Sequence, residues 1–341
     1  MRPWLLCFLG WLAILPTFVL LVVVVAVGGS WSGLGFALGF FTGALGLLAS
    51  RGSRRLRLFA PAGLAIVLLT AFVRTFTGAR GETISATGPD GARSSRLLGR
   101  ILDEQDASVI ATHALVSLNL LSDPEVNALP AAMRSGYRRM RATEGDGPSP
   151  LVPTYAGMES PGAFDVIVVD GVTSRRGALI FLHGFAGNFT LPCWQIAQAA
   201  RRAGLVTFCP STGWRGEWWT AEGEAILRRT LALVRARGLH QVWLAGLSNG
   251  AIGASRLLPR VRGAFRGMLL VSCAASDAPS PGVPTLVLAG RGDAMCPARI
   301  ARTYATRTGA SYVGLEGGHF VMLTREDAVL DEISKWLIIH G

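Results

Sequence analysis

Uncharged, apolar runs dominate the first 73 residues of the chain. Residues 4–27 and 31–50 contain no charged side chain, and each reaches the roughly 20 residues that a helix needs to cross a bilayer. The first run is longer than the roughly 7–15 apolar residues of a cleaved signal peptide, which favours a membrane helix. A third run, residues 58–73, is shorter and has Pro61 near its start. The pattern predicts a membrane region at residues 1–75 with two helices and a third near the lower limit of length.

Arginines between the second and third runs predict the orientation of this region. Arg51, Arg54, Arg55 and Arg57 lie in that loop, whereas the loop between the first two runs has no basic residue. Positive loops stay in the cytoplasm, so three crossings would place the rest of the chain outside it. If residues 58–73 do not span, the large domain is cytoplasmic. We expect an integral protein of a bacterial-type inner membrane or a plasma membrane.

The pattern changes twice after the membrane region. Residues 76–160 begin as a polar, glycine-rich linker and continue with helical periodicity, which breaks at Asp123-Pro124. From residue 161 to residue 341, short β-branched and leucine-rich runs alternate with amphipathic helical patterns. This alternation predicts an α/β domain with a mostly parallel sheet and helices on both faces. Functional residues in such domains lie at the carboxyl ends of the strands.

Composition and charge exclude some functions. The net charge is +11, but the 33 basic residues are arginines apart from one lysine, and they are dense only at residues 51–57. Signals for membrane topology and solvent-exposed surfaces explain these arginines. We therefore expect contact with membrane lipid and no binding of nucleic acid. Gly35, Gly39 and Gly43 recur every four residues, a spacing that permits an oligomer through close helix packing. The spacing of the cysteines matches no metal motif and leaves disulfides and buried thiols open; outside the membrane region they are Cys193, Cys209, Cys273 and Cys296.

One short motif carries candidate chemistry. The sequence Gly246-Leu-Ser248-Asn-Gly250 follows a predicted strand and precedes a predicted helix. This context holds a serine exposed on a sharp turn, and a nucleophilic serine needs an imidazole that a carboxylate orients. Asp293 and His319 each follow a later predicted strand and supply these groups. Asp277 follows the predicted strand that lies between those of Ser248 and Asp293, and it is the alternative acid.

The order Ser, Asp, His resembles that of the α/β-hydrolases over residues 164–340. The segment FLHGFAGN, residues 181–188, resembles the His-Gly loop of that family. The resemblance implies an oxyanion hole formed by the backbone N–H groups of Phe185 and Asn249. It also implies that His183 shapes the turn, with a direct chemical role as the alternative. Three tryptophans follow a strand end and fit an acyl pocket, a membrane surface or core packing; they are Trp214, Trp218 and Trp219.

These features predict a membrane-anchored serine hydrolase that cleaves a carboxylic ester or thioester through an acyl-enzyme on Ser248, without a metal or cofactor. We expect its substrate to be a small-molecule or lipid-like ester. The same triad would also serve a peptidase or an acyltransferase. A different class of function is a catalytically idle hydrolase-like domain used for binding.

The predicted topology has a direct test. A reporter that is active only outside the cytoplasm, fused after Gly341, should be active because three crossings export the domain. A reporter that requires the cytoplasm serves as the matched control. Activity of the cytoplasmic reporter alone would mean that residues 58–73 do not span the membrane.

Overall fold

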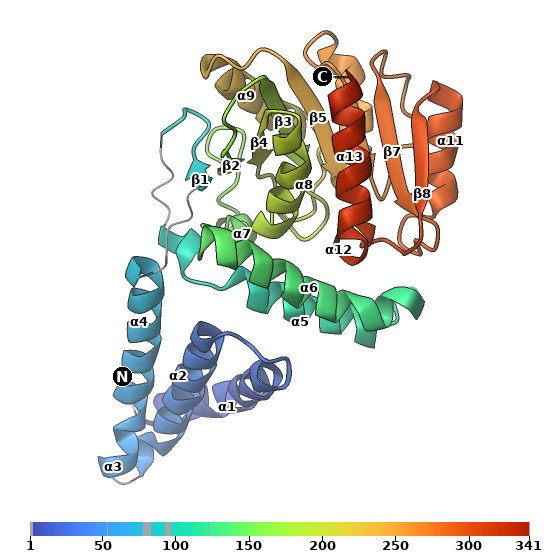
Figure 1. Cartoon of the computed structure of the whole chain (residues 1–341). Helices are drawn as coiled ribbons and strands as arrows, with labels where there is room; N and C mark the ends of the chain where they lie inside the picture. The colour runs from blue at the N-terminus through green and yellow to red at the C-terminus, as the bar shows by residue number, and fades with distance from the viewer. Residues whose placement is uncertain (1–2, 53, 78–82, 93–96, 122, 341) are drawn as a thin grey trace. The chain divides into compact units, whose positions relative to one another are not determined.

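The chain forms two units, each described separately below. A computed structural model describes residues 3–52, 54–77, 83–92, 97–121 and 123–340 (Figure 1). The helical unit comprises residues 1–78 and 100–114, and the sheet unit comprises residues 79–99 and 115–341. In this division residues 115–160 are grouped with the sheet, and the sequence-based boundary at residue 160 stays a prediction.

Three long helices make up most of the helical unit: α1 (Pro3–Ala26), α2 (Trp31–Leu48) and α4 (Phe59–Thr77). Two short helices, η1 (Ala49–Arg51) and α3 (Arg54–Arg57), join α2 to α4. Three helical stretches are long and apolar enough to cross a membrane: Trp4–Ala26, Trp31–Leu48 and Arg54–Phe76. The third is 23 residues long, so length does not set it apart from the first. The orientation of these helices stays a prediction.

The glycines of α2 lie against α4 of the same chain. A Cβ added at Gly35 would come within 2.6 Å of Thr70 Oγ1, and one added at Gly39 would come within 2.7 Å of Val67 Cγ2. Gly43 accepts a Cβ without contact, but its backbone touches Gly63 of α4 closely. Small residues let the two backbones approach, as in membrane helix pairs generally. The glycine stripe therefore serves packing within the chain, and an oligomer through it stays a prediction.

Acidic residues tie residues 100–114 to the long helices. The Asp106 carboxylate accepts hydrogen bonds from Ser30 N at 2.7 Å and Ser30 Oγ at 2.6 Å, where α2 begins. A negative charge at a helix N-terminus is stabilising because it meets the positive end of the macrodipole. Asp103 forms a buried ion pair with Arg74 near the end of α4, at 3.4 Å.

An eight-stranded sheet forms the centre of the sheet unit, in the order β1-β2-β4-β3-β5-β6-β7-β8. Strands β3 to β8 run parallel, whereas β2 is antiparallel to both β1 and β4. The strands are β1 (Ile84–Thr87), β2 (Val166–Val169), β3 (Gly177–Leu182), β4 (Leu205–Pro210), β5 (Val242–Leu247), β6 (Met268–Val271), β7 (Thr285–Gly290) and β8 (Ser311–Leu315). The predicted mostly parallel α/β sheet is confirmed.

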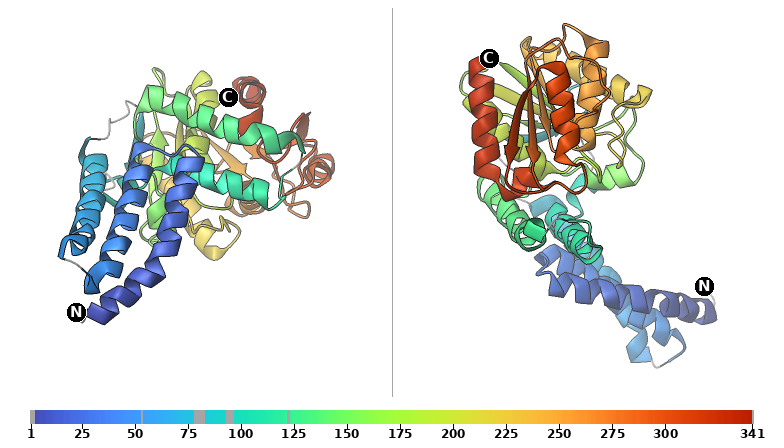
Figure 2. Two further views of the ribbon diagram at one scale, coloured as in Figure 1. Left: turned by 90° about the horizontal axis from the view of Figure 1, so that it is seen from below. Right: turned by 90° about the vertical axis from the view of Figure 1, so that its right-hand side faces the viewer.

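Alternate residues of the central strands face two separate apolar layers. In β3, Ile180 and Leu182 pack in one layer, whereas Leu179 and Phe181 pack in the other. The first layer includes residues of α9 (Ala221–Ala236), α10 (Asn249–Leu257), η3 (Leu258–Val261) and α11 (Ala298–Thr308). The second includes residues of α6 (Asp123–Glu144), α8 (Thr190–Arg202), α12 (Val321–Thr324) and α13 (Glu326–His340). Figure 2 shows α11 and α13 on opposite sides of the sheet.

One part of residues 76–160 differs from the sequence-based expectation. Residues 84–87, expected in a linker, form β1 and pair with β2 at the edge of the sheet. The short helices η2 (Leu97–Arg100) and α7 (Leu151–Tyr155) also lie in this part of the chain. The predicted pair of helices is α5 (Glu104–Ser117) and α6. Most of α5 belongs to the helical unit, whereas α6 belongs to the sheet unit.

Candidate active site

Ser248 lies on a strained turn between β5 and α10. Its backbone has φ 54° and ψ −117°, a conformation that non-glycine residues rarely adopt. A Cβ at Gly246 would overlap the Gly250 carbonyl, and a Cβ at Gly250 would overlap the Leu182 carbonyl of β3. The strand, the turn and the helix approach this closely only because both flanking residues are glycine. The turn leaves Ser248 partly exposed at the carboxyl end of the sheet.

The structure brings Ser248, His319 and Asp293 into one hydrogen-bonded chain. His319 Nε2 lies 2.9 Å from Ser248 Oγ, and His319 Nδ1 lies 2.8 Å from Asp293 Oδ2. Asp293 follows β7 and His319 follows β8. Because these strands run parallel to β5, all three groups lie at the carboxyl end of the sheet. Asp293 and His319 are buried. This geometry suits proton transfer from the serine hydroxyl to an imidazole that a carboxylate orients.

The loop around Asp293 is held in place by its own backbone and by a disulfide. Asp293 Oδ1 accepts hydrogen bonds from Met295 N at 2.9 Å and Cys296 N at 2.8 Å. Cys296 is bonded to Cys273, in the loop after β6, so the acid loop is tied to its neighbour. A second disulfide joins Cys193 of α8 to Cys209 of β4. Of the two alternatives for these four cysteines, the structure has the disulfides.

The alternative acid, Asp277, takes no part in the hydrogen-bonded chain of Ser248, His319 and Asp293. Its side chain is 72% exposed and forms an ion pair with Arg256 at 3.1 Å. The hydrogen bond from Arg256 lowers the pKa of the Asp277 carboxyl. Glu316, close to His319 in sequence, is also exposed and lies 3.5 Å from Arg325. Among the described residues, no group of three or more His, Cys, Asp and Glu side chains could hold a metal ion.

His183 is buried beneath the loop that follows β3. Its Nε2 accepts a hydrogen bond from Thr212 N at 3.1 Å, which leaves Nδ1 to donate to the Gly184 carbonyl at 2.8 Å. Burial lowers the pKa of His183 to about 4, since the charged form loses its hydration. Both ring nitrogens are therefore used within the loop and the next strand end, which favours the shaping role over a chemical one.

The two residues expected to form the oxyanion hole flank the serine from different elements. Phe185 belongs to the loop between β3 and α8, and a Cβ at the preceding Gly184 would lie 3.2 Å from Ser248 Cβ. Asn249 is the first residue of α10, so its N–H is among those that have no partner within the helix. The Asn249 side chain donates to the Arg215 carbonyl at 2.8 Å, which joins the turn to the loop after β4.

Glu125 of α6 is a residue that the sequence analysis did not single out. Its buried carboxylate accepts a hydrogen bond from Phe320 N at 2.7 Å, directly after His319. Helix α6 also packs against α12, which follows the same loop (Figure 1). Helix α6 thus holds the backbone next to His319, although Glu125 and Phe320 are 195 residues apart in sequence. In the sequence, Glu125 resembles any acidic residue in the first turn of a helix, so no local signal distinguishes it.

The three tryptophans have different environments. Trp218 is fully buried and donates from Nε1 to the His183 carbonyl at 2.9 Å, so it belongs to the core. Trp214 is exposed. Its ring centroid is 6.3 Å from that of Tyr155 and 5.2 Å from that of Phe185. Trp219 is partly buried under Arg256. Tyr155, Phe185 and Trp214 form an exposed aromatic cluster beside the Ser248 turn.

Comparisons with known proteins give structural neighbours only. An esterase of Pyrococcus furiosus is 12% identical, with a TM-score of 0.44, over 51% of this chain and 87% of that one. An esterase of Thermogutta terrifontis is 18% identical, with a TM-score of 0.42, over 53% and 95%. XC6422 of Xanthomonas campestris, described as an α/β serine hydrolase without a lid, is 18% identical, with a TM-score of 0.43, over 52% and 88%. No family model and no curated protein matches the sequence.

The sheet unit has the α/β-hydrolase fold that the sequence resembles. Its parallel strands, the strained turn from β5 to α10, and the Ser, Asp and His groups in that order are the features of the fold. This geometry confirms the predicted fold of the sheet unit, and the apolar N-terminal helices that the sequence predicts are present.

The two candidate acids can be separated by mutation. Asp293→Asn should lower the turnover of an ester by about 10⁴-fold, because a neutral partner stabilises the wrong tautomer of the imidazole. Asp277→Asn removes the same charge from an exposed position and should leave turnover within about twofold. Steady-state kinetics on both purified variants would check this, and the reverse ranking would contradict the geometry described above.

The low pKa of His183 predicts acid sensitivity of the fold. In the unfolded chain this imidazole gains a proton below its ordinary value of 6.5, whereas in the folded chain it stays neutral down to about pH 4. The unfolded state then binds more protons, so the free energy of unfolding should fall by about 3 kcal/mol as the pH drops from 6.5 to 4. The free energy of unfolding, measured with urea across this range, should depend less on pH in His183→Gln than in the wild type. Equal slopes for the two proteins would contradict the prediction.

Proposed function

We propose that the chain is a membrane-anchored serine hydrolase that cleaves a carboxylic ester or thioester through an acyl-enzyme on Ser248. The observation that carries the proposal is the hydrogen-bonded chain from Ser248 Oγ through His319 to Asp293, with distances of 2.9 and 2.8 Å. Membrane anchoring rests on the three helices that are long and apolar enough to cross a bilayer. The chemistry needs no group beyond the substrate and water.

The proposed reaction has two halves. Ser248 Oγ attacks the carbonyl carbon while its proton passes to His319 Nε2, and the N–H groups of Phe185 and Asn249 stabilise the resulting oxyanion. The tetrahedral intermediate collapses, and the leaving alcohol or thiol takes the proton from His319. Water then repeats the attack on the acyl-enzyme with His319 as the base, which releases the acid and restores Ser248. Asp293 holds the imidazole in its orientation throughout.

The exposed aromatic cluster supports an apolar acyl group or a lipid-like ester as the substrate. Phe185 belongs to the proposed oxyanion hole, so Trp214 and Tyr155 beside it lie near the position of the scissile carbonyl. Aromatic rings provide large apolar surfaces, and exposed ones are typical of binding sites. The described residues 272–284, between β6 and β7, form only turns and bends, which supports an open site.

Three other functions are compatible with the same fold. A peptidase or an acyltransferase would share the acyl-enzyme and differ in the leaving group or in the acceptor. A binding domain without turnover would keep the fold and lose the chemistry. The strain stored at Ser248 argues against this last alternative, because such strain is concentrated at reactive sites.

Replacing the nucleophile tests the proposal. Ser248→Ala should keep the fold, with a change in stability within the roughly 0.5–3 kcal/mol of ordinary substitutions. It should lose ester hydrolysis and labelling by a fluorophosphonate, since no acyl-enzyme forms. Esters and thioesters of increasing chain length, with a peptide amide for comparison, would identify the substrate class. A folded Ser248→Ala protein with parental activity would overturn the proposal, as would a wild-type protein that takes no label.

A further inference from the structure

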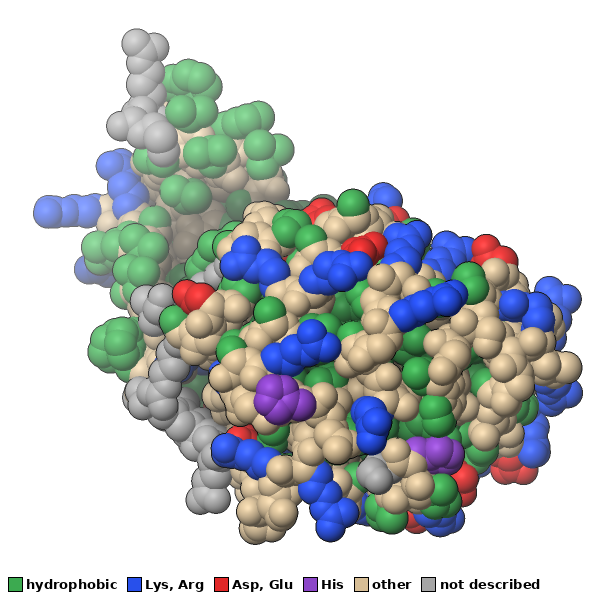
Figure 3. Space-filling model, turned by 90° about the horizontal axis from the view of Figure 1, so that it is seen from above, with side chains coloured by type: hydrophobic (Ala, Val, Ile, Leu, Met, Phe, Trp, Pro, Cys, Tyr) green, Lys and Arg blue, Asp and Glu red, His purple; other side chains and the backbone are tan. Residues whose placement is uncertain are grey.

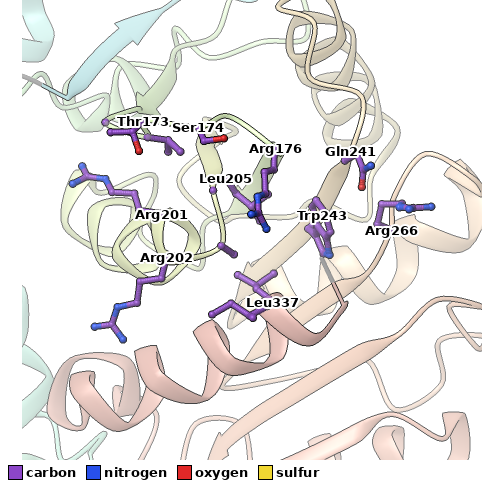
Figure 4. Close-up of a pocket in the computed structure, with 15 residues that line it drawn as sticks. Thr173, Ser174, Arg176, Arg201, Arg202, Leu205, Gln241, Trp243, Arg266 and Leu337 are labelled. Atoms are coloured by element: carbon purple, nitrogen blue, oxygen red, sulfur yellow. The ribbon is translucent and has the colours of Figure 1, made fainter.

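A cavity of about 730 Å³ lies at the opposite end of the sheet from Ser248. It opens where strands begin: its lining includes Leu205, at the start of β4, Trp243 of β5, and Arg176, directly before β3 (Figure 4). The catalytic groups follow the carboxyl ends of the strands, so the cavity takes no part in the chemistry proposed above.

Four arginines give the cavity its charge: Arg176, Arg201, Arg202 and Arg266. Of the described residues that line it, none is Asp or Glu. Figure 3, which looks onto the molecule from above, shows basic side chains across the middle of this face and acidic ones mainly around its edge. The surface around the cavity therefore attracts anions.

Two of the arginines have partners within the fold. Arg201 and Arg202 lie in the last turn of α8, where a positive charge meets the negative end of the helix dipole. Arg202 pairs with Asp331 at 2.6 Å, and Arg201 lies 3.4 Å from Glu144, whose carboxylate also accepts hydrogen bonds from Thr83. Packing and helix ends explain this pair without a ligand.

Arg176 and Arg266 have no such explanation. Both are exposed, neither lies in a helix, and no carboxylate of the described residues is within 4.0 Å of either. Figure 4 shows them on opposite sides of Trp243 in this view, with Arg176 extending toward the middle of the cavity. Two uncompensated guanidinium groups around one hollow favour a ligand with more than one negative charge.

Trp243 supplies an independent observation at the same place. Its side chain is 1% exposed and lines the cavity. In the part of the chain that the structure describes, its Nε1 has no hydrogen-bond partner, and the same holds for Arg201 Nε. A buried N–H without an acceptor is costly, and an oxygen of a ligand in the cavity would supply one.

We propose that this cavity binds a phosphate group, held by Arg176 and Arg266 and by the indole N–H of Trp243. Phosphate carries more than one charge near neutral pH, presents several acceptor oxygens and matches the fork of a guanidinium. Leu205 and Leu337 add apolar surface for the group that the phosphate esterifies. The phosphate belongs either to a soluble ester or to the headgroup of an anionic lipid.

Binding is measured on the full chain in neutral detergent. The soluble probes are inorganic phosphate and glycerol 3-phosphate, and the lipid probe is phosphatidic acid in mixed micelles, with phosphatidylcholine micelles as the blank. At least one probe should bind saturably in calorimetry and raise the unfolding temperature. A soluble probe that binds identifies a soluble ester, and binding of phosphatidic acid alone identifies a lipid headgroup. If no probe binds, the proposal is overturned.

Variants assign the site. Arg176→Ala/Arg266→Ala should weaken binding by at least about tenfold, because it removes the charge-assisted hydrogen bonds of both guanidinium groups to the phosphate. The control, Arg229→Ala/Arg235→Ala, removes the same charge from exposed positions on α9 outside the cavity and should bind like wild type. Equal losses in both would mean unspecific attraction and overturn the proposal. Trp243→Phe, which keeps an aromatic side chain but removes the N–H, should also weaken binding if folded.

The site is independent of the proposed hydrolase activity. Ser248→Ala should therefore bind the same probe with unchanged affinity. Ser248→Ala should lose labelling but keep phosphate binding. Arg176→Ala/Arg266→Ala should keep labelling but lose phosphate binding. The failure of one proposal can therefore be told apart from the failure of the other.

Discussion

The close approach of β5, α10 and the end of β3 is the constraint on which the candidate site depends. No side chain fits at Gly246 or Gly250, because the carbonyls of neighbouring elements occupy the space. This contact forces Ser248 into a strained backbone conformation and leaves its hydroxyl at the sheet edge. The acid and the base reach the same end of the sheet only because β7 and β8, on the far side of β6, run parallel to β5. The local strain is sustained by a buried sheet that is packed on both faces.

The parts of this arrangement that depend on short-range pattern could be predicted from sequence. Alternating apolar runs indicated the parallel strands, and Ser248, Asp293 and His319 each lie in the turn or loop that follows one of them. Their convergence then follows from the rule that parallel strands end at a common edge. The choice of Asp293 over Asp277 depended on a resemblance, and the structure adds a physical reason. Asp293 is buried with two backbone donors, whereas Asp277 is exposed and paired with Arg256.

Contacts between distant residues could not be predicted in this way. Glu125 meets Phe320 across 195 residues, and Asp106 meets Ser30 across 76. Neither carboxylate differs in its local sequence from an ordinary acidic residue in the first turn of a helix. Strand β1 could not be predicted for a similar reason. Its four residues lie in a glycine-rich region and form a strand because they pair with β2. The glycines of α2 suggested a partner helix, but sequence alone could not say that this helix is α4.

The path of the chain through the two units has a consequence for their separation. The backbone leaves the helical unit near residue 78, returns to it near residue 100 and leaves again near residue 114. Three covalent connections therefore join the units, where a simple anchored domain has one. A protease that cuts the first connection leaves the sheet unit joined to residues 100–114 of the helical unit. No single cut releases an intact sheet unit, because a break after residue 114 detaches the chain that carries β2 to β8 from the edge strand β1.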